Sequence, residues 1–299
     1  MQKQTLIHSG LAIVACLLWS TAFVGIKYGL VYTEALQFAG LRFFLSGLLL
    51  LPLVKSRSDY FAAIKNNFKL VLKVSAFQTF ILYGLFYTGL DLIEGAMAAI
   101  VIGSQPLFAA LVAHLLMKND KMSLSKSLSI SLGIGGIILI ALPKGISGPE
   151  GWSEVLGIVL LVLANIASGI GNVIVSKKRG NISPIILNSS QMILGGMMLY
   201  TVSLFTEPFT GFIFPMEYYL SLLWLTFLSA AAFSIWFFLL QKPNVKVSEL
   251  NIYKFIIPVF GASLSWLILP NESPNLISII GMLIIGASVI LYSIVATKN

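Results

Sequence analysis

The sequence predicts an all-helical (all-α) integral membrane protein, in which ten transmembrane helices form two inverted-topology five-helix repeats. Three observations support this prediction: the chain is too apolar for a soluble protein, it contains ten apolar segments of spanning length, and the charges between these segments alternate between two sides. Of its 299 residues, 58% are hydrophobic and only 10% are charged, whereas a soluble domain carries about 25% charged residues. Such a chain needs lipid around it.

Each apolar segment is close to the roughly 20 residues that a helix needs to cross a bilayer. Backbone groups in lipid must be hydrogen-bonded within the segment, and the alternation typical of a membrane β-barrel is missing, so we expect helices. The first apolar run continues to Leu30, which is too long for a cleavable signal, and we expect it to remain as the first span. The predicted spans are residues 9–30, 35–54, 70–90, 95–117, 124–142, 155–176, 184–205, 218–240, 247–269 and 276–296.

The charges between the spans predict the orientation of the protein. The side that holds both termini carries fifteen Lys and Arg against three acids, and the other side carries one base, Lys144, against eight acids. The positive-inside rule places the base-rich side in the cytoplasm. We therefore expect a multi-pass protein of the cell membrane, and of a bacterial inner membrane because no organellar transit peptide is evident. Basic residues dispersed over short loops do not indicate a nucleic-acid partner.

The two halves of the chain resemble each other. Residues 104–110 and 256–262 share a proline at the third position, and each stretch leads to an Asn–acid pair, Asn119-Asp120 and Asn271-Glu272. Because each half has an odd number of spans, the second half enters the membrane from the opposite side. Such inverted repeats are typical of alternating-access transporters, whose binding site lies between the halves near the midplane. The predicted division is a first repeat at 1–143, a linker at 144–153 and a second repeat at 154–299.

Four short stretches carry a family resemblance. They are Trp19-Ser20-Thr21-Ala22-Phe23, Arg42-Phe43, Pro106-Leu107-Phe108-Ala109-Ala110 and Pro258-Val259-Phe260-Gly261-Ala262. With them, nearly the whole chain resembles the drug/metabolite transporter superfamily, and specifically its EamA-type members. The resemblance implies a ten-helix basket with a central cavity and the export of amino acids, other metabolites or amphipathic drugs. Two features depart from the family pattern: the loop acids follow Asn instead of Gly, and the second half lacks the aromatic stretch.

Ionisable residues inside spans cost about 2.5–3.5 kcal/mol on insertion scales and are therefore candidates for function. Four such residues are present, Lys27, Arg42, His114 and Lys254. Lys27 is near the outer end of its span and can extend its amine to the interface. His114 can take part in proton exchange or bond a neighbouring helix.

Arg42 and Lys254 each have two interpretations. Arg42 can clamp a substrate carboxylate with two hydrogen bonds, or it can bond helix-end carbonyls or pair with the outer acids Asp91 and Glu94. Lys254 can satisfy a carbonyl freed by Pro258, or it can face a cavity and attract an anionic group. If both cations line the cavity, they favour a carboxylate-bearing substrate.

The matched prolines Pro106 and Pro258 indicate where the cavity lies, because helices interrupted at corresponding places mark transporter sites. A fixed kink without ligand contact is the alternative. Polar and aromatic residues at similar depth could line the cavity, form interhelical hydrogen bonds or face the lipid interface. The predicted lining is Trp19, Ser20, Thr21, Arg42, Gln78, Gln105, Pro106, Asn165, Gln191, Trp236, Lys254 and Pro258.

The sequence also lacks several features that other functions require. No Asp or Glu occupies the middle of a span, so uniport, exchange and His-mediated coupling stay open while a carboxylate relay has no candidate. The chain has no Gly-x-Ser-x-Gly motif, and its two histidines are on different helices, so we expect no catalytic residues, metal or cofactor. We predict a secondary transporter of a small molecule. The alternatives are a scaffold or sensor, a lipid scramblase and an intramembrane enzyme, and the residues determine neither substrate, direction nor oligomeric state.

Overall fold

The computed structural model describes residues 2–54, 56–117, 123–145, 149–178, 180–211, 213–242 and 245–298. All regular elements in these residues are helical, including the 3-10 helices η1 and η3 and the π-helix η2. The elements are α1 (Gln2–Ser20), α2 (Ala22–Leu30), α3 (Ala35–Leu49), η1 (Leu51–Leu53), α4 (Arg57–Asn66), α5 (Phe68–Val74), η2 (Ser75–Phe80), α6 (Ile81–Asp91), α7 (Gly95–Ile102), α8 (Gln105–Leu116), α9 (Leu124–Gly145), α10 (Pro149–Lys177), α11 (Pro184–Thr206), α12 (Met216–Leu240), α13 (Val247–Ile252), η3 (Tyr253–Phe255), α14 (Ile256–Ile268) and α15 (Leu276–Lys298).

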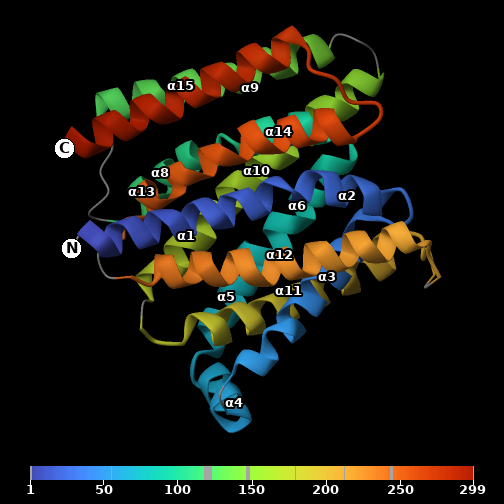
Figure 1. Ribbon diagram of the computed structural model, residues 1–299, viewed down its shortest axis with the longest axis vertical. Helices are drawn as coiled ribbons and strands as arrows, with labels where there is room; N and C mark the ends of the chain where they lie inside the picture. The colour runs from blue at the N-terminus through green and yellow to red at the C-terminus, as the bar shows by residue number, and fades with distance from the viewer. Residues whose placement is uncertain are drawn as a thin grey trace.

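These elements form the predicted bundle of spanning helices. Nine stretches of the described chain are long and apolar enough to cross a membrane, and α15 adds a further apolar helix at the C-terminal end. Several spans consist of consecutive helices, as in the first one, where α1 and α2 together cover Ile7–Leu30. The short helix α4 lies at the edge of the bundle (Figure 1). The prediction of an all-helical membrane protein with ten spans is confirmed.

The two halves pack on each other in a two-fold pattern. Three pairs join equivalent spans of the two halves: α3 of the second span packs on α11 of the seventh, α7 of the fourth on α14 of the ninth, and α9 of the fifth on α15 of the tenth. Two further pairs, α1 with α12 and α6 with α10, exchange with each other under the same symmetry. In Figure 1 the pair α9 and α15 lies at the top of the bundle and the pair α3 and α11 near the bottom. An inverted repeat predicts this arrangement.

Glycines allow the backbones of α3 and α11 to approach closely. A Cβ atom added at Gly40 would lie 2.6 Å from the backbone nitrogen of Tyr200, and one added at Gly47 would lie 2.7 Å from the carbonyl oxygen of Ser189. Helices in lipid associate through such close packing because lipid supplies no hydrophobic force between them.

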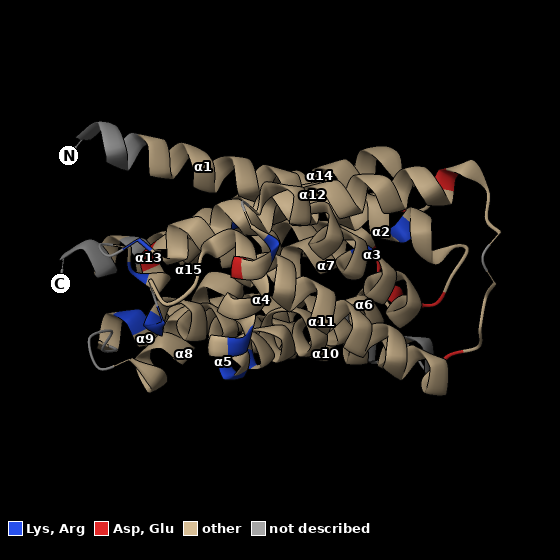
Figure 2. Ribbon diagram, turned by 90° about the horizontal axis from the view of Figure 1, so that it is seen from below, with Lys and Arg blue, Asp and Glu red and all other residues tan. Residues whose placement is uncertain are grey.

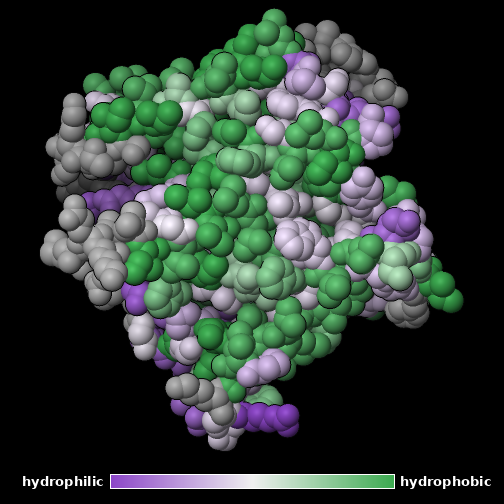
Figure 3. Space-filling view, in the orientation of Figure 1, coloured by the Kyte–Doolittle hydropathy of each residue, from purple (hydrophilic) through white to green (hydrophobic). Residues whose placement is uncertain are grey.

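The charged side chains are divided between the two ends of the bundle. Lys and Arg gather at the end that holds both termini, and most Asp and Glu lie at the opposite end (Figure 2). Between the ends the surface is apolar: hydrophobic side chains cover the middle of the face in Figure 3, and hydrophilic ones gather at its margins. Leu223 on α12 and Leu267 on α14 are 67% and 81% exposed, as expected for side chains that face lipid.

Two acids at the acid-rich end connect the halves. The Glu207 carboxylate, after α11, accepts hydrogen bonds from the backbone N–H groups of Leu36 and Gln37 in α3, at 2.7 and 3.0 Å. Burial raises the pKa of Glu207, and these two bonds act in the opposite direction. Glu272, after α14, accepts hydrogen bonds from the first two backbone N–H groups of α7, at 2.6 and 2.8 Å. Each acid therefore caps a helix of the other half, where the helix dipole favours a negative charge.

Candidate functional site

A cavity lies inside the bundle and is lined by helices of both halves. Its volume is about 60 Å³, which is room for a few water molecules. The cavity is therefore narrow in this structure. It is lined by Trp19, Ala22, Phe23, Arg42, Gln78, Leu82, Tyr83, Phe86, Ile102, Gln105, Ser168, Asn172, Phe233, Trp236, Lys254 and Ile257.

Four of the spans that line the cavity change their helical geometry beside it. The first span passes from α1 to α2 next to Trp19, and the third contains the π-helix η2, which holds Gln78. The fourth span breaks between α7 and α8, just before Gln105, and the ninth passes through the 3-10 helix η3, which holds Lys254. The fourth and ninth spans are counterparts in the two halves, and helices interrupted at matching positions are typical of transporter sites. A π-helical turn such as η2 often marks a functional site.

Polar side chains donate additional hydrogen bonds to backbone carbonyls at these breaks. The Thr21 hydroxyl donates to the carbonyl of Leu18 at 2.8 Å. At the break of the fourth span, the Ser104 hydroxyl donates to the carbonyl of Val101 at 2.6 Å. Asn165, from the second half, donates to the same carbonyl and to the Ser104 hydroxyl, each at 3.1 Å. These residues stabilise the shape of the cavity wall.

The structure places half of the predicted lining residues around the cavity. Those that line it are Trp19, Arg42, Gln78, Gln105, Trp236 and Lys254. Those that it places outside the lining are Ser20, Thr21, Pro106, Asn165, Gln191 and Pro258.

The residues outside the lining have partners within the wall. The Ser20 hydroxyl donates to a carbonyl one turn earlier in α1, and the Gln191 amide donates to Asn188 at 3.1 Å. Pro106 is in the first turn of α8. Pro258 packs so closely on Gly103 that a Cβ atom there would overlap its ring. The matched prolines thus mark the two helix breaks, while other side chains face the space between them.

Arg42 is buried and tied to two other spans. Its Nε donates to the Ser229 hydroxyl at 2.9 Å, and one terminal nitrogen donates to the Tyr87 hydroxyl at 2.7 Å. The guanidinium carbon lies 4.9 Å from the centre of the Phe43 ring and 5.8 Å from those of Tyr83 and Tyr87. These contacts join α3 to α6 and α12.

Other expectations for the charged residues differ from the structure. Arg42 bonds hydroxyl groups instead of the outer acids Asp91 and Glu94, so that alternative is wrong. The reason is that Tyr87 and a serine of α12 reach it at its own depth in the membrane. His114 lies on α8, half-buried and outside the cavity lining.

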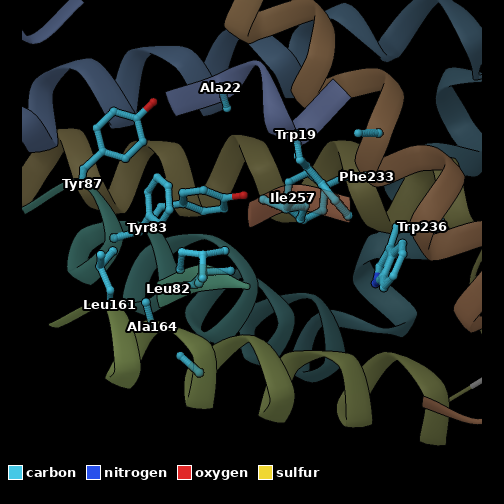
Figure 4. Packing of buried hydrophobic residues seen from close by; sticks show 14 of the residues in the cluster. Trp19, Ala22, Leu82, Tyr83, Tyr87, Leu161, Ala164, Phe233, Trp236 and Ile257 are labelled. Atoms are coloured by element: carbon cyan, nitrogen blue, oxygen red, sulfur yellow. The ribbon is translucent and has the colours of Figure 1, made fainter. Parts of the chain in front are cut away.

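Lys254 lies between two tryptophans at one end of the cavity. Its Nζ is 4.5 Å from the ring centre of Trp236 and 5.2 Å from that of Trp19. The two indoles meet edge to face with ring centres 5.2 Å apart. Figure 4 shows both tryptophans among the buried side chains, with Phe233 and Ile257 next to Trp19. Within the described part of the chain, no group of three or more His, Cys, Asp or Glu side chains is placed to hold a metal ion.

A chain of amide side chains joins three spans next to the cavity. The Gln78 amide nitrogen donates to the oxygen of Asn172 at 2.7 Å, and the nitrogen of Asn172 donates to Asn251 at 3.2 Å. Asn251 in turn donates to the carbonyl of Val247 at 2.8 Å. This chain connects the third, sixth and ninth spans toward the base-rich end.

Several apolar lining residues were not among the predicted site residues, although helical spacing identifies them. Phe233 precedes Trp236 by three residues, and Leu82 and Phe86 follow Gln78 by four and eight. Residues three or four apart lie on one face of a helix. Residues three or four positions before or after each candidate would have included these apolar lining residues.

Comparison with known proteins agrees with this architecture. The model of the EamA-like transporter family matches residues 7–142 and 155–294. The chain belongs to this family. The predicted resemblance is thereby confirmed, and this EamA-like transporter is a multi-pass membrane protein.

Several relatives and one solved structure cover nearly the whole transporter. The uncharacterized transporter YoaV of Bacillus subtilis is 23% identical over 270 residues, which are 90% of each chain. The uncharacterized transporter sll0355 of Synechocystis is 27% identical over 293 residues, or 92% of this chain and 87% of the relative. The S-adenosylmethionine/S-adenosylhomocysteine transporter of Chlamydia muridarum is 22% identical over 284 residues, which are 91% of this chain and 88% of the relative. A protein of known crystal structure shares the fold, with a TM-score of 0.71 at 15% identity over 97% and 98% of the two chains.

Proposed function

We propose that this EamA-like transporter is an alternating-access exporter of small metabolites, such as amino acids or amphipathic drugs, through the central cavity. The observation that carries the proposal is the position of the cavity: it is lined by both halves of an inverted repeat, at the depth where four spans are interrupted. In such repeats, the substrate site lies between the halves near the midplane.

The same geometry suggests how access alternates. Residues 1–143 and 154–299 are the two exchanging halves, and residues 144–153 connect them. At the acid-rich end, Glu207 and Glu272 hold helices of the first half. Beside the cavity, toward the base-rich end, the amide chain from Gln78 to Asn251 joins the halves. Breaking one set of contacts while the other is kept would open the cavity to one side at a time.

Charge distribution supports the orientation of the exporter. The base-rich end, which holds both termini, faces the cytoplasm of a bacterial cell under the positive-inside rule. The opposite, acid-rich end then faces outward, and export moves the substrate from the first end to the second.

Other functional classes fit the site less well. A scaffold or sensor has no need for a cavity that both halves line with cationic and amide side chains. A scramblase needs a path that is open sideways to lipid, whereas these lining residues lie inside the bundle. The relatives are named as transporters, which favours transport over catalysis.

Flux through purified protein in liposomes tests the proposal. The probes are a mixture of radiolabelled amino acids and the amphipathic dye ethidium. We expect flux of at least one probe above that of empty liposomes, and we expect Ala22→Trp to abolish it, because Ala22 lines the cavity and is 6% exposed. Gly135→Trp is the matched control, since nothing lies within 4 Å of a Cβ atom there. Absence of flux for all probes, or equal flux through Ala22→Trp, would contradict the proposal.

A further inference from the structure

The two cations that line the cavity differ in how the protein satisfies them. Arg42 donates to two hydroxyl groups and is packed against three aromatic rings. Its planar guanidinium is therefore fixed to the wall, as a structural link between spans. Lys254 is 4% exposed, and within the described residues no carboxylate or other hydrogen-bond acceptor contacts its ammonium group.

Burial of an ammonium group is costly unless an anion or hydrogen-bond acceptors compensate for the lost water. The rings of Trp19 and Trp236 compensate in part, because a desolvated cation over an indole is attracted to the ring face. This attraction is smaller than the effective cost of removing an ammonium ion from water. The surroundings of Lys254 in this structure therefore lack a negative or acceptor group.

The two tryptophans lack the same kind of partner. The indole nitrogens of Trp19 and Trp236 are both buried and have no hydrogen-bond acceptor. Buried indole N–H groups usually find one. Both rings flank the Lys254 ammonium, with centres at 5.2 and 4.5 Å from it, and both residues line the cavity. The Lys254 ammonium and two indole N–H groups without acceptors thus belong to three residues that lie against one another in the wall of the same cavity.

The geometry points to a carboxylate subsite at this part of the cavity wall, in which Lys254 and the indole N–H groups of Trp19 and Trp236 receive the carboxylate of an organic substrate. A carboxylate is the complement of these donors because it only accepts hydrogen bonds and carries the opposite charge. The apolar body of the substrate would lie along Leu82 and Phe86, which line the same cavity. This inference rests on the proposed function, since it assigns a part of the substrate to the same cavity.

Binding to matched pairs of small molecules tests the carboxylate subsite. The purified transporter is titrated calorimetrically with acetate, hexanoate and phenylacetate, and with the corresponding neutral amides acetamide, hexanamide and phenylacetamide. We expect at least one carboxylate to bind about tenfold or more tightly than its amide, because a charged hydrogen-bonded pair is lost in the amide. If no carboxylate binds more tightly than its amide, the subsite is wrong.

Three variants locate the effect. Lys254→Met should remove the preference for carboxylate over amide, and Lys254→Arg should retain part of it. Trp236→Phe keeps an aromatic ring but removes the N–H donor, so it should weaken carboxylate binding about threefold to tenfold. Lys126→Met is the matched control, because Lys126 also lies over an aromatic ring, at 5.9 Å from the centre of Tyr292, and does not line the cavity. It should bind like the wild type.

The melting temperature of Lys254→Met without ligand shows whether Lys254 has a structural role. If Lys254 awaits an anion, Lys254→Met removes an uncompensated buried charge and should melt at the same or a higher temperature than the wild type. If Lys254 is only a structural contact of the tryptophans, the variant should melt lower, which would contradict the inference. Flux is measured separately in liposomes. Carboxylate binding without any flux would support the subsite and contradict the proposed transport. Flux without a preference for carboxylates would support transport and contradict the subsite.

Discussion

Arg42 shows how a single residue can carry a charge inside a lipid-embedded bundle. Its guanidinium, 1% exposed, bonds one hydroxyl from α6 and one from α12 and lies against aromatic rings. Hydroxyl oxygens accept hydrogen bonds from a cation and bring no second charge that would also need desolvation. Each of these bonds then contributes to the packing of three spans, and the loss of one would leave a buried donor without a partner.

Removal of the Tyr87 hydroxyl tests this role of Arg42. We expect Tyr87→Phe to lower the free energy of unfolding by about 1–2 kcal/mol, since it leaves a charged donor of Arg42 unbonded in a buried place. Tyr83→Phe is the control, because its ring also lies against Arg42 but its hydroxyl is not the one that Arg42 bonds. Unfolding in mixed detergent micelles measures both. An equal loss of stability in the two variants would contradict the account.

At the scale of helices, the ends and breaks carry the contacts that relate the halves. The fourth span begins at α7, whose first two backbone N–H groups are bonded by Glu272 from the second half. The same span breaks between α7 and α8, where Asn165 from the second half donates a further hydrogen bond to the carbonyl of Val101. Both ends of α7 are therefore held by side chains of the other half.

Truncation of Glu272 tests the cap on α7. We expect Glu272→Ala to lower the free energy of unfolding by about 1–2 kcal/mol, because two backbone donors lose a negatively charged acceptor at a helix N-terminus. Glu217→Ala is the matched control, since Glu217 is an exposed acid in the first turn of α12, and it should cost less than about 0.5 kcal/mol. Thermal unfolding of the purified variants compares them. If Glu217→Ala costs as much as Glu272→Ala, the cap has no special role.

Some helix breaks could be predicted from the sequence and others could not. The breaks of the fourth and ninth spans lie beside Pro106 and Pro258, and a proline removes a helical hydrogen bond wherever it occurs. The break at Thr21 and the π-helix Ser75–Phe80 contain no proline. There the geometry depends on bonds with neighbouring residues, as between Thr21 and the Leu18 carbonyl, and on packing against other spans. No pattern along the chain indicates these contacts.

At the scale of the whole molecule, hydropathy was sufficient to predict the number of the spans, because lipid requires each one to be a long apolar helix. The site was predicted in part. Trp19, Trp236 and Lys254 were each candidates, but they come from the first, eighth and ninth spans. Their meeting around one ammonium group depends on tertiary packing. Likewise, some polar residues at the depth of the cavity line it, and others form hydrogen bonds within its wall. The direction of each side chain decides between the two, and hydropathy does not predict that direction.

The central claim is that one cavity is reached from both sides of the membrane in turn. The chain has a single cysteine, Cys16, so Cys16→Ala gives a background in which Ser168→Cys places one thiol in the cavity lining. In the same background, Lys65→Cys on α4 and Glu217→Cys on α12, both exposed in the structure, report the sides that the proposed orientation assigns to the cytoplasm and to the exterior.

The most direct measurement is the labelling of these variants by a membrane-impermeant maleimide, in right-side-out and in inside-out vesicles. Alternating access predicts that Glu217→Cys is labelled only in right-side-out vesicles and Lys65→Cys only in inside-out vesicles, while Ser168→Cys is labelled in both. Labelling of Ser168→Cys from only one side, or from neither, would contradict the account.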